Sequence, residues 1–119
     1  MTIHNLLRKR LLEQAGLAET PARFLRLQDL EQSEWSDAFE RLMRNRLIMG
    51  ALRYGLMHGP RPDYDYISDT IRRLQAYQES GNTEHLVDVA NLCLLAFELD
   101  RHPKKHFASG DDGEHCKIK

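Results

Sequence analysis

Four polar side chains share one face of an otherwise apolar segment, where they could bind a metal ion or a polar substrate. The segment 84–98 is apolar on most sides, and its exceptions are Glu84, Asp88, Asn91 and Glu98. At about 100° per residue, their spacing places all four within a stripe of roughly 80° on a helix. A helix that is apolar around most of its circumference belongs in a core, where carboxylates are costly unless they are paired or bind a metal. The stripe therefore either faces water or lines a functional site.

A second pair of acids could complete such a site. Asp37 and Glu40 are one turn apart on a predicted helix, as Glu84 and Asp88 are on theirs. Two such pairs facing each other would repel unless a divalent cation lay between them, and carboxylate oxygens suit Mg²⁺ or Mn²⁺. Asp37 also lies near the start of its helix, where the helix dipole favours acids without any further function.

Asp65 and Asp69 form a competing pair of acids. Asp69 is, however, well placed for ordinary ion pairs with Arg72 and Arg73, three and four residues further along the same predicted helix. We therefore favour the first two pairs as the candidate metal ligands.

The end of the third predicted helix combines a glycine, arginines and a tyrosine. Gly50 in mid-helix costs about 1 kcal/mol relative to alanine, which indicates that a crossing helix or a ligand approaches the backbone there. Arg44, Arg46 and Arg53 could bind phosphates, because a guanidinium matches their geometry. Tyr54 could stack on a nucleotide base. The alternative is a solvated basic face with one amphipathic aromatic residue.

The C-terminal tail gathers side chains that can bind transition metals, but their spacing matches no zinc-finger pattern. They are His102, His106, Asp111, Asp112, His115 and Cys116. We interpret this segment as a surface tail or an arm that contacts another subunit, with metal binding as the alternative.

Composition limits the possible classes of protein. A chain of 119 residues is long enough for one modest core, and a formal charge of −1 gives no indication of general nucleic-acid binding. No apolar run is long enough to span a bilayer, and Arg8, Lys9 and Arg10 interrupt the apolar residues that a signal peptide would need. Cys93 and Cys116 lie in very different surroundings, so we expect no disulfide between them. A cytoplasmic protein without a membrane partner is predicted.

Five helices and no strand are predicted, which gives an all-α fold, a small helical bundle. The expected helices cover about 3–14, 21–30, 33 or 36 to 54, 64–78, and 84 to just before Pro103. The turn at 80–83 is short, so the last two helices should be antiparallel neighbours. On the fourth helix the expected core side carries Tyr66, Ile67, Thr70, Ile71, Leu74 and Tyr77. We expect one domain over 1–119, with a core at 33–100, N-terminal helices at 3–30 and a tail at 103–119.

Acid pairs on two helices of such a bundle, together with the segments 50–55, 72–74 and 85–92, resemble the MazG-like nucleoside triphosphate pyrophosphohydrolase superfamily, in particular its small phage-encoded members. The resemblance covers about 33–100. That superfamily typically carries Glu-Glu-x-x-Glu on one helix and Glu-x-x-Asp on a later one. This sequence has Asp37-x-x-Glu40 and Glu84-x-x-x-Asp88 instead.

The resemblance implies Mg²⁺-dependent hydrolysis of a (deoxy)nucleoside triphosphate to the monophosphate and pyrophosphate. It implies that Glu40, Glu84 and Asp88 bind Mg²⁺ or Mn²⁺ and that Asp37 and Glu40 are the catalytic acids. It further implies a homodimer or higher oligomer, and a substrate bound by Asn91, Arg44, Arg46, Arg53 and Tyr54. The alternatives are a non-enzymatic helical interaction protein, phage-encoded and binding a host complex, or a nucleotide-binding sensor.

Overall fold

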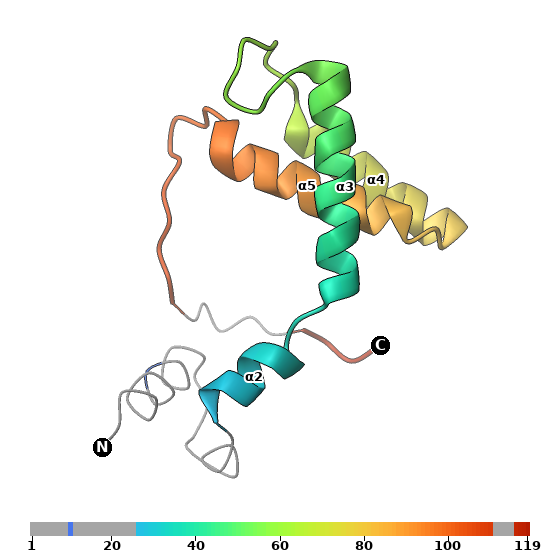
Figure 1. Ribbon diagram of the computed structural model, residues 1–119, viewed down its shortest axis with the longest axis vertical. Coiled ribbons are helices and arrows are strands. Elements are labelled where there is room, and N and C mark those ends of the chain that lie inside the picture. The colour runs from blue at the N-terminus through green and yellow to red at the C-terminus, as the bar shows by residue number, and fades with distance from the viewer. Residues whose placement is uncertain (1–9, 11–25, 111–115) are drawn as a thin grey trace. The chain divides into compact units, whose positions relative to one another are not determined.

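The computed structural model describes residues 10, 26–110 and 116–119, and the regular structure in these residues is entirely helical. Four helices are defined there, namely α2 (Leu27–Ser33), α3 (Asp37–Tyr54), α4 (Tyr66–Ser80) and α5 (Glu84–Leu99), as Figure 1 shows. The predicted all-α class is confirmed. The predicted helix at 3–14 lies outside the described residues, except for Arg10, which is helical and exposed.

The chain divides into two compact units. One comprises residues 36–104 and therefore contains α3, α4 and α5, while the other comprises residues 1–35 and 105–119 and contains α2. The residues of the candidate site all lie in the unit 36–104.

Helix α2 differs from its prediction. Arg26 is extended, with φ −81° and ψ 147°, so the helix begins at Leu27 rather than continuing through Arg26 from Pro21. The Arg26 side chain pairs with Asp29 at 3.0 Å. No glycine or proline follows Leu30 to stop the helix at the predicted place, and it continues to Ser33. The predicted start at residues 20–21 lies outside the described residues.

Helix α3 ends at Tyr54 as predicted, and of the two predicted starts, Ser33 and Ser36, the structure has Ser36. The Ser36 hydroxyl accepts a hydrogen bond from the Phe39 backbone N–H at 3.1 Å and so caps the first turn. Gly55 ends the helix with φ 96°, a conformation that favours glycine. Its N–H donates to the Ala51 carbonyl at 3.0 Å.

Helix α4 starts two residues later than predicted because Asp65, and not a residue before it, is the N-cap. The Asp65 carboxylate accepts bonds from the backbone N–H and the hydroxyl of Ser68, at 3.0 and 2.8 Å. These bonds lower the pKa of the Asp65 carboxyl from its ordinary value of 3.8. Gly81, with φ 70°, ends the helix, and its N–H donates to the Tyr77 carbonyl.

Helix α5 begins after a turn of three residues, so it runs antiparallel to α4, against which it packs. The Asn82 side chain accepts from the Glu84 backbone N–H at 3.0 Å. The helix ends at Leu99, where Asp100 becomes extended, before Pro103 can act as the stop. Helix α3 crosses α5 (Figure 1).

The interior of the unit 36–104 is small. Among the described residues the buried apolar side chains are Tyr66 and Val87. Of the predicted core side of α4, the residues Ile67, Ile71 and Leu74 remain 54%, 52% and 43% exposed. The physical reason is that α4 packs only against α5 among the described helices, and these three residues lie on another face of α4. The prediction placed them in a core that this unit does not close by itself.

Helix α5 is likewise less buried than its composition predicts, since Cys93 and Phe97 are exposed. Cys93 and Cys116 are both free thiols. None of the helices in the described part of the chain is both long and apolar enough to cross a membrane.

Candidate functional site

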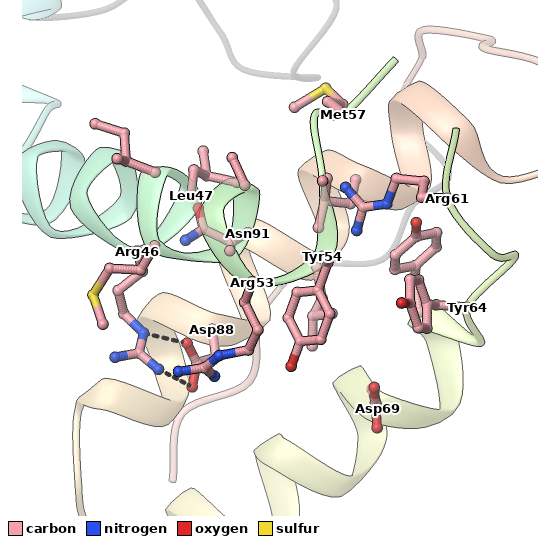
Figure 2. A pocket seen from close by; sticks show the side chains of 18 of the residues that line it. Arg46, Leu47, Arg53, Tyr54, Met57, Arg61, Tyr64, Asp69, Asp88 and Asn91 are labelled. Carbon is pink, nitrogen blue, oxygen red and sulfur yellow. Dashed lines mark hydrogen bonds and ion pairs between the residues drawn. The ribbon is translucent and has the colours of Figure 1, made fainter. Parts of the chain in front are cut away.

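A cavity of about 830 Å³ lies within the unit 36–104. It is lined by α3, the loop after it, α4 and α5, and Figure 2 shows the side chains around it. Its volume is in the range of sites that bind small molecules and cofactors. The charged side chains of the lining are Arg46, Arg53, Arg61, Asp69, Arg73, Glu84 and Asp88.

Asp88 is held by two arginines on one wall of this cavity. Its carboxylate accepts a hydrogen bond from Arg46 Nε at 2.6 Å and another from Arg73 Nη1 at 3.0 Å. Arg46 also pairs with Glu84 at 3.0 Å. The Asp88 side chain is only 12% exposed, so this ion-pair network is partly shielded from solvent. The hydrogen bond to Asp88, with the charges of Asp88 and Glu84, raises the pKa of Arg46 against the opposing effect of burial.

The crossing of α3 and α5 explains why these residues meet. Asn91 is 6% exposed, and its amide Nδ2 donates to the Met43 carbonyl at 3.0 Å, which ties the two helices together. Arg46 lies about one turn after Met43, and Asp88 about one turn before Asn91, so the same crossing brings them together. The Asn91 oxygen is buried and accepts no hydrogen bond within the described residues.

The opposite part of the cavity is aromatic. Tyr54, Tyr64 and Tyr66 follow one another edge to face, with ring centroids 5.7 and 6.3 Å apart. The guanidinium of Arg53 lies 5.8 Å from the Tyr54 ring centre, and that of Arg61 lies 5.5 Å from the Tyr64 ring centre. Both distances are typical of cation–π contacts.

Positive charge is therefore unequally balanced along the cavity wall. Asp88 and Glu84 neutralise Arg46 and Arg73, and Asp69 pairs with Arg72, which is not in the lining. Among the described residues, no carboxylate forms an ion pair with Arg53 or Arg61. In addition, the Nε atoms of Arg61 and Arg73 are buried without a hydrogen-bond acceptor there. The cavity thus presents unused N–H donors and uncompensated cationic charge.

The structure brings together six of the residues that the sequence analysis singled out. Arg46, Arg53, Tyr54, Glu84, Asp88 and Asn91 all line the cavity. Asp37, Glu40, Arg44 and Glu98 do not. Glu40 pairs with Arg44 at 3.3 Å on the surface of α3, and Asp37 is exposed in the first turn of the same helix.

The two acid pairs are thus not gathered into one cluster. No group of three or more His, Cys, Asp or Glu side chains in the described ranges is placed to hold a metal ion. Asp88 directs both of its oxygens to arginines, and Glu84 directs one to Arg46. In this arrangement the carboxylates of Glu84 and Asp88 bind guanidinium groups.

Several residues of the cavity were not predicted to belong to a site, among them Arg61, Tyr64 and Arg73. Arg73 was expected to pair with Asp69, but Asp69 binds only Arg72, at 2.6 Å. A signal for the true partner was present, because Arg73 and Asp88 lie at nearly equal distances on either side of Gly81. An antiparallel helix pair that turns at this glycine places them opposite each other.

Gly50 also lines the cavity. A Cβ atom at this position would meet no other atom within 4 Å. The close approach that the sequence predicts at Gly50 is therefore not made by a crossing helix, and the backbone here borders open space.

The resemblance to the MazG-like superfamily rests on acid pairs of which Glu84 and Asp88 lie in the cavity and Asp37 and Glu40 do not. Glu84 and Asp88 lie in a cavity that is lined by arginines and has a tyrosine-rich wall. No protein-family model matches this sequence, and neither the curated proteins nor the solved structures gave a significant match, so the resemblance stays a prediction.

Proposed function

We propose that this protein binds a (deoxy)nucleoside triphosphate in the cavity between α3, α4 and α5. The observation that carries the proposal is the uncompensated positive charge beside a row of tyrosines, in a cavity of about 830 Å³. Guanidinium groups with free N–H donors suit the oxygens of a phosphate chain. Tyrosine rings offer a surface on which a base can stack.

The proposed ligand assigns a role to each part of the wall. Tyr54 is 48% exposed and Tyr64 37% exposed, so both rings can still be covered by a base. Asn91 borders the same space and is proposed to touch the nucleoside. A nucleotide ligand also agrees with the cytoplasmic location that the sequence predicts.

Calorimetric titration of the full chain with individual nucleoside and deoxynucleoside triphosphates tests this proposal. We expect saturable binding that Tyr54→Leu weakens, because the variant removes an exposed ring of the wall. Phe107→Leu is the matched control, since Phe107 is 83% exposed and lies outside the cavity. Absence of heat and of thermal stabilisation with every nucleotide would contradict the proposal.

A second candidate function is the Mg²⁺-dependent release of pyrophosphate from the bound nucleotide. The observation in its favour is that Glu84 and Asp88 both line the cavity and share the partner Arg46. Pyrophosphate release should then require Mg²⁺ and should be lost in the variant Glu84→Gln. The Glu84 side chain is half-exposed, so this substitution disturbs the packing little. Turnover that Glu84→Gln leaves unchanged would assign the hydrolysis to another group or to a contaminant.

We also propose that the chain forms a homo-oligomer. Support comes from the apolar stripe of α4, defined as Ile67, Ile71 and Leu74, which lies at helical spacing and is about half-exposed in the unit 36–104. An exposed contiguous apolar surface is typical of an interaction site. A purely non-enzymatic interaction protein is less well supported, because Glu84 and Asp88 of α5 border a cavity and pair with arginines.

A further inference from the structure

We propose that the phosphate chain of the ligand is held by Arg53 and Arg61, at the tyrosine end of the cavity, and that this contact needs no divalent cation. The inference rests on the proposed nucleotide binding and specifies which charges of the cavity perform it. Neither the acid motifs nor the arginine pair that binds Asp88 takes part in it.

The first step is that Arg46 and Arg73 are already occupied. Asp88 accepts from them at 2.6 and 3.0 Å, and its side chain is only 12% exposed. A phosphate that took either guanidinium would leave a carboxylate with little access to water and with one partner fewer. Such a loss is unfavourable, because a shielded charge without its partner is costly. The network therefore serves to hold α3, α4 and α5 together.

The second step is that Arg53 and Arg61 are available. Neither has a carboxylate partner among the described residues, and the Arg61 Nε–H is buried without an acceptor. Each guanidinium lies over a tyrosine ring, at 5.8 Å for Arg53 and 5.5 Å for Arg61. A ring contact leaves the edge of the guanidinium free to donate hydrogen bonds, so the tyrosines orient these donors without using them.

The third step is that Arg53 and Arg61 lie on either side of the Tyr54 ring. Arg53 contacts the Tyr54 ring and Arg61 contacts the Tyr64 ring. These two rings are in edge-to-face contact, with centroids 5.7 Å apart. In Figure 2, Tyr54 lies between the Arg53 and Arg61 side chains at the border of the cavity. With one uncompensated guanidinium group on each side of Tyr54, Arg53 and Arg61 can neutralise different parts of an extended phosphate chain directly. A metal ion is then not required to offset the ligand's charge.

The experiment is a calorimetric titration of the full chain with inorganic triphosphate and with deoxynucleoside triphosphates, each in EDTA and in Mg²⁺. Binding is expected in EDTA with both probes, and more tightly with the nucleotides because of their bases. Arg53→Ala and Arg61→Ala should each weaken binding by roughly ten- to a hundredfold, which is the usual change in affinity when a hydrogen bond to a charged group is lost. Arg61→Lys should restore only part of the loss, since an ammonium group lacks the planar fork.

Arg41→Ala is the matched control, because Arg41 is an exposed arginine of α3 outside the cavity lining. Circular dichroism and urea unfolding of each variant separate a lost contact from a lost fold. Binding that occurs only with Mg²⁺ would overturn the inference while leaving the proposed function intact. So would binding in EDTA that is insensitive to Arg53 and Arg61 and instead requires Arg73. No binding under either condition would remove the proposed function itself.

Discussion

The ion-pair network around Asp88 should make a measurable contribution to folding. Exposed ion pairs contribute about 0.2–1 kcal/mol, whereas removing one partner of a buried pair costs about 3–5 kcal/mol. Asp88 is 12% exposed, but its partners Arg46 and Arg73 are 34% and 37% exposed. The expected loss for Asp88→Asn therefore lies between these limits, at roughly 2 kcal/mol in the free energy of unfolding.

Urea unfolding followed by circular dichroism measures this value, and a double-mutant cycle isolates the pair. Asp88→Asn, Arg73→Gln and the double variant should show a coupling energy of about 1 kcal/mol, because contacting residues are not additive. Asp69→Asn is the matched control, since Asp69 and Arg72 form an exposed pair on α4 with 45% and 70% exposure. An Asp88→Asn variant as stable as the parent would refute the assignment of Asp88 as the carboxylate that holds the three helices.

Three further results are expected. Gly50→Ala should stabilise the protein by about 1 kcal/mol in urea unfolding, because alanine favours the helix and its methyl group meets no atom within 4 Å; a loss of stability would show that the position is packed. The lowered pKa of Asp65 means that its cap on α4 stabilises fully above the ordinary value of 3.8 and is lost as the pH falls through the lowered pKa. Asp65→Asn, which keeps a capping oxygen, should therefore weaken the acid dependence of unfolding. An unaltered pH profile would show that the Asp65 carboxylate does not contribute to that dependence. Ile71→Lys should shift the species seen by light scattering toward the monomer, because it charges the centre of the apolar stripe of α4, whereas an unchanged mass would place the self-association elsewhere.

Local signals predicted the helices well where a cap or a glycine is decisive. Gly55 ends α3 as the sequence predicts, and Ser36, one of the two predicted starts, caps it. The failures have a different cause. The local sequence gives no indication that α4 lacks a second partner helix within its unit. The predicted burial of Ile67, Ile71 and Leu74 was therefore wrong. Burial depends on what packs against a face, which the periodicity of one helix does not reveal.

The candidate site was predictable only in part, because periodicity gives the face of a helix but not the residues that pack against it. The face that carries Glu84, Asp88 and Asn91 follows from helical spacing, and it does border the cavity. The partners of Asp88 come from two other helices, and their choice depends on how α3 crosses α5. Arg61 and Tyr64 lie in the loop after α3, where no periodicity places a side chain. Only the folded chain brings these two residues to the tyrosine wall.

A structure with so few buried apolar side chains has a consequence for how its ligand can be found. Folding and binding are thermodynamically linked, so a ligand at about a hundred times its dissociation constant adds about 2.7 kcal/mol of stability. For a unit whose buried apolar side chains are Tyr66 and Val87, such an addition is a large share of the total. Resistance to protease digestion should therefore rise steeply with the true ligand. If the proposed nucleotide is the ligand, the abundance of this protein in a cell would follow the concentration of that nucleotide.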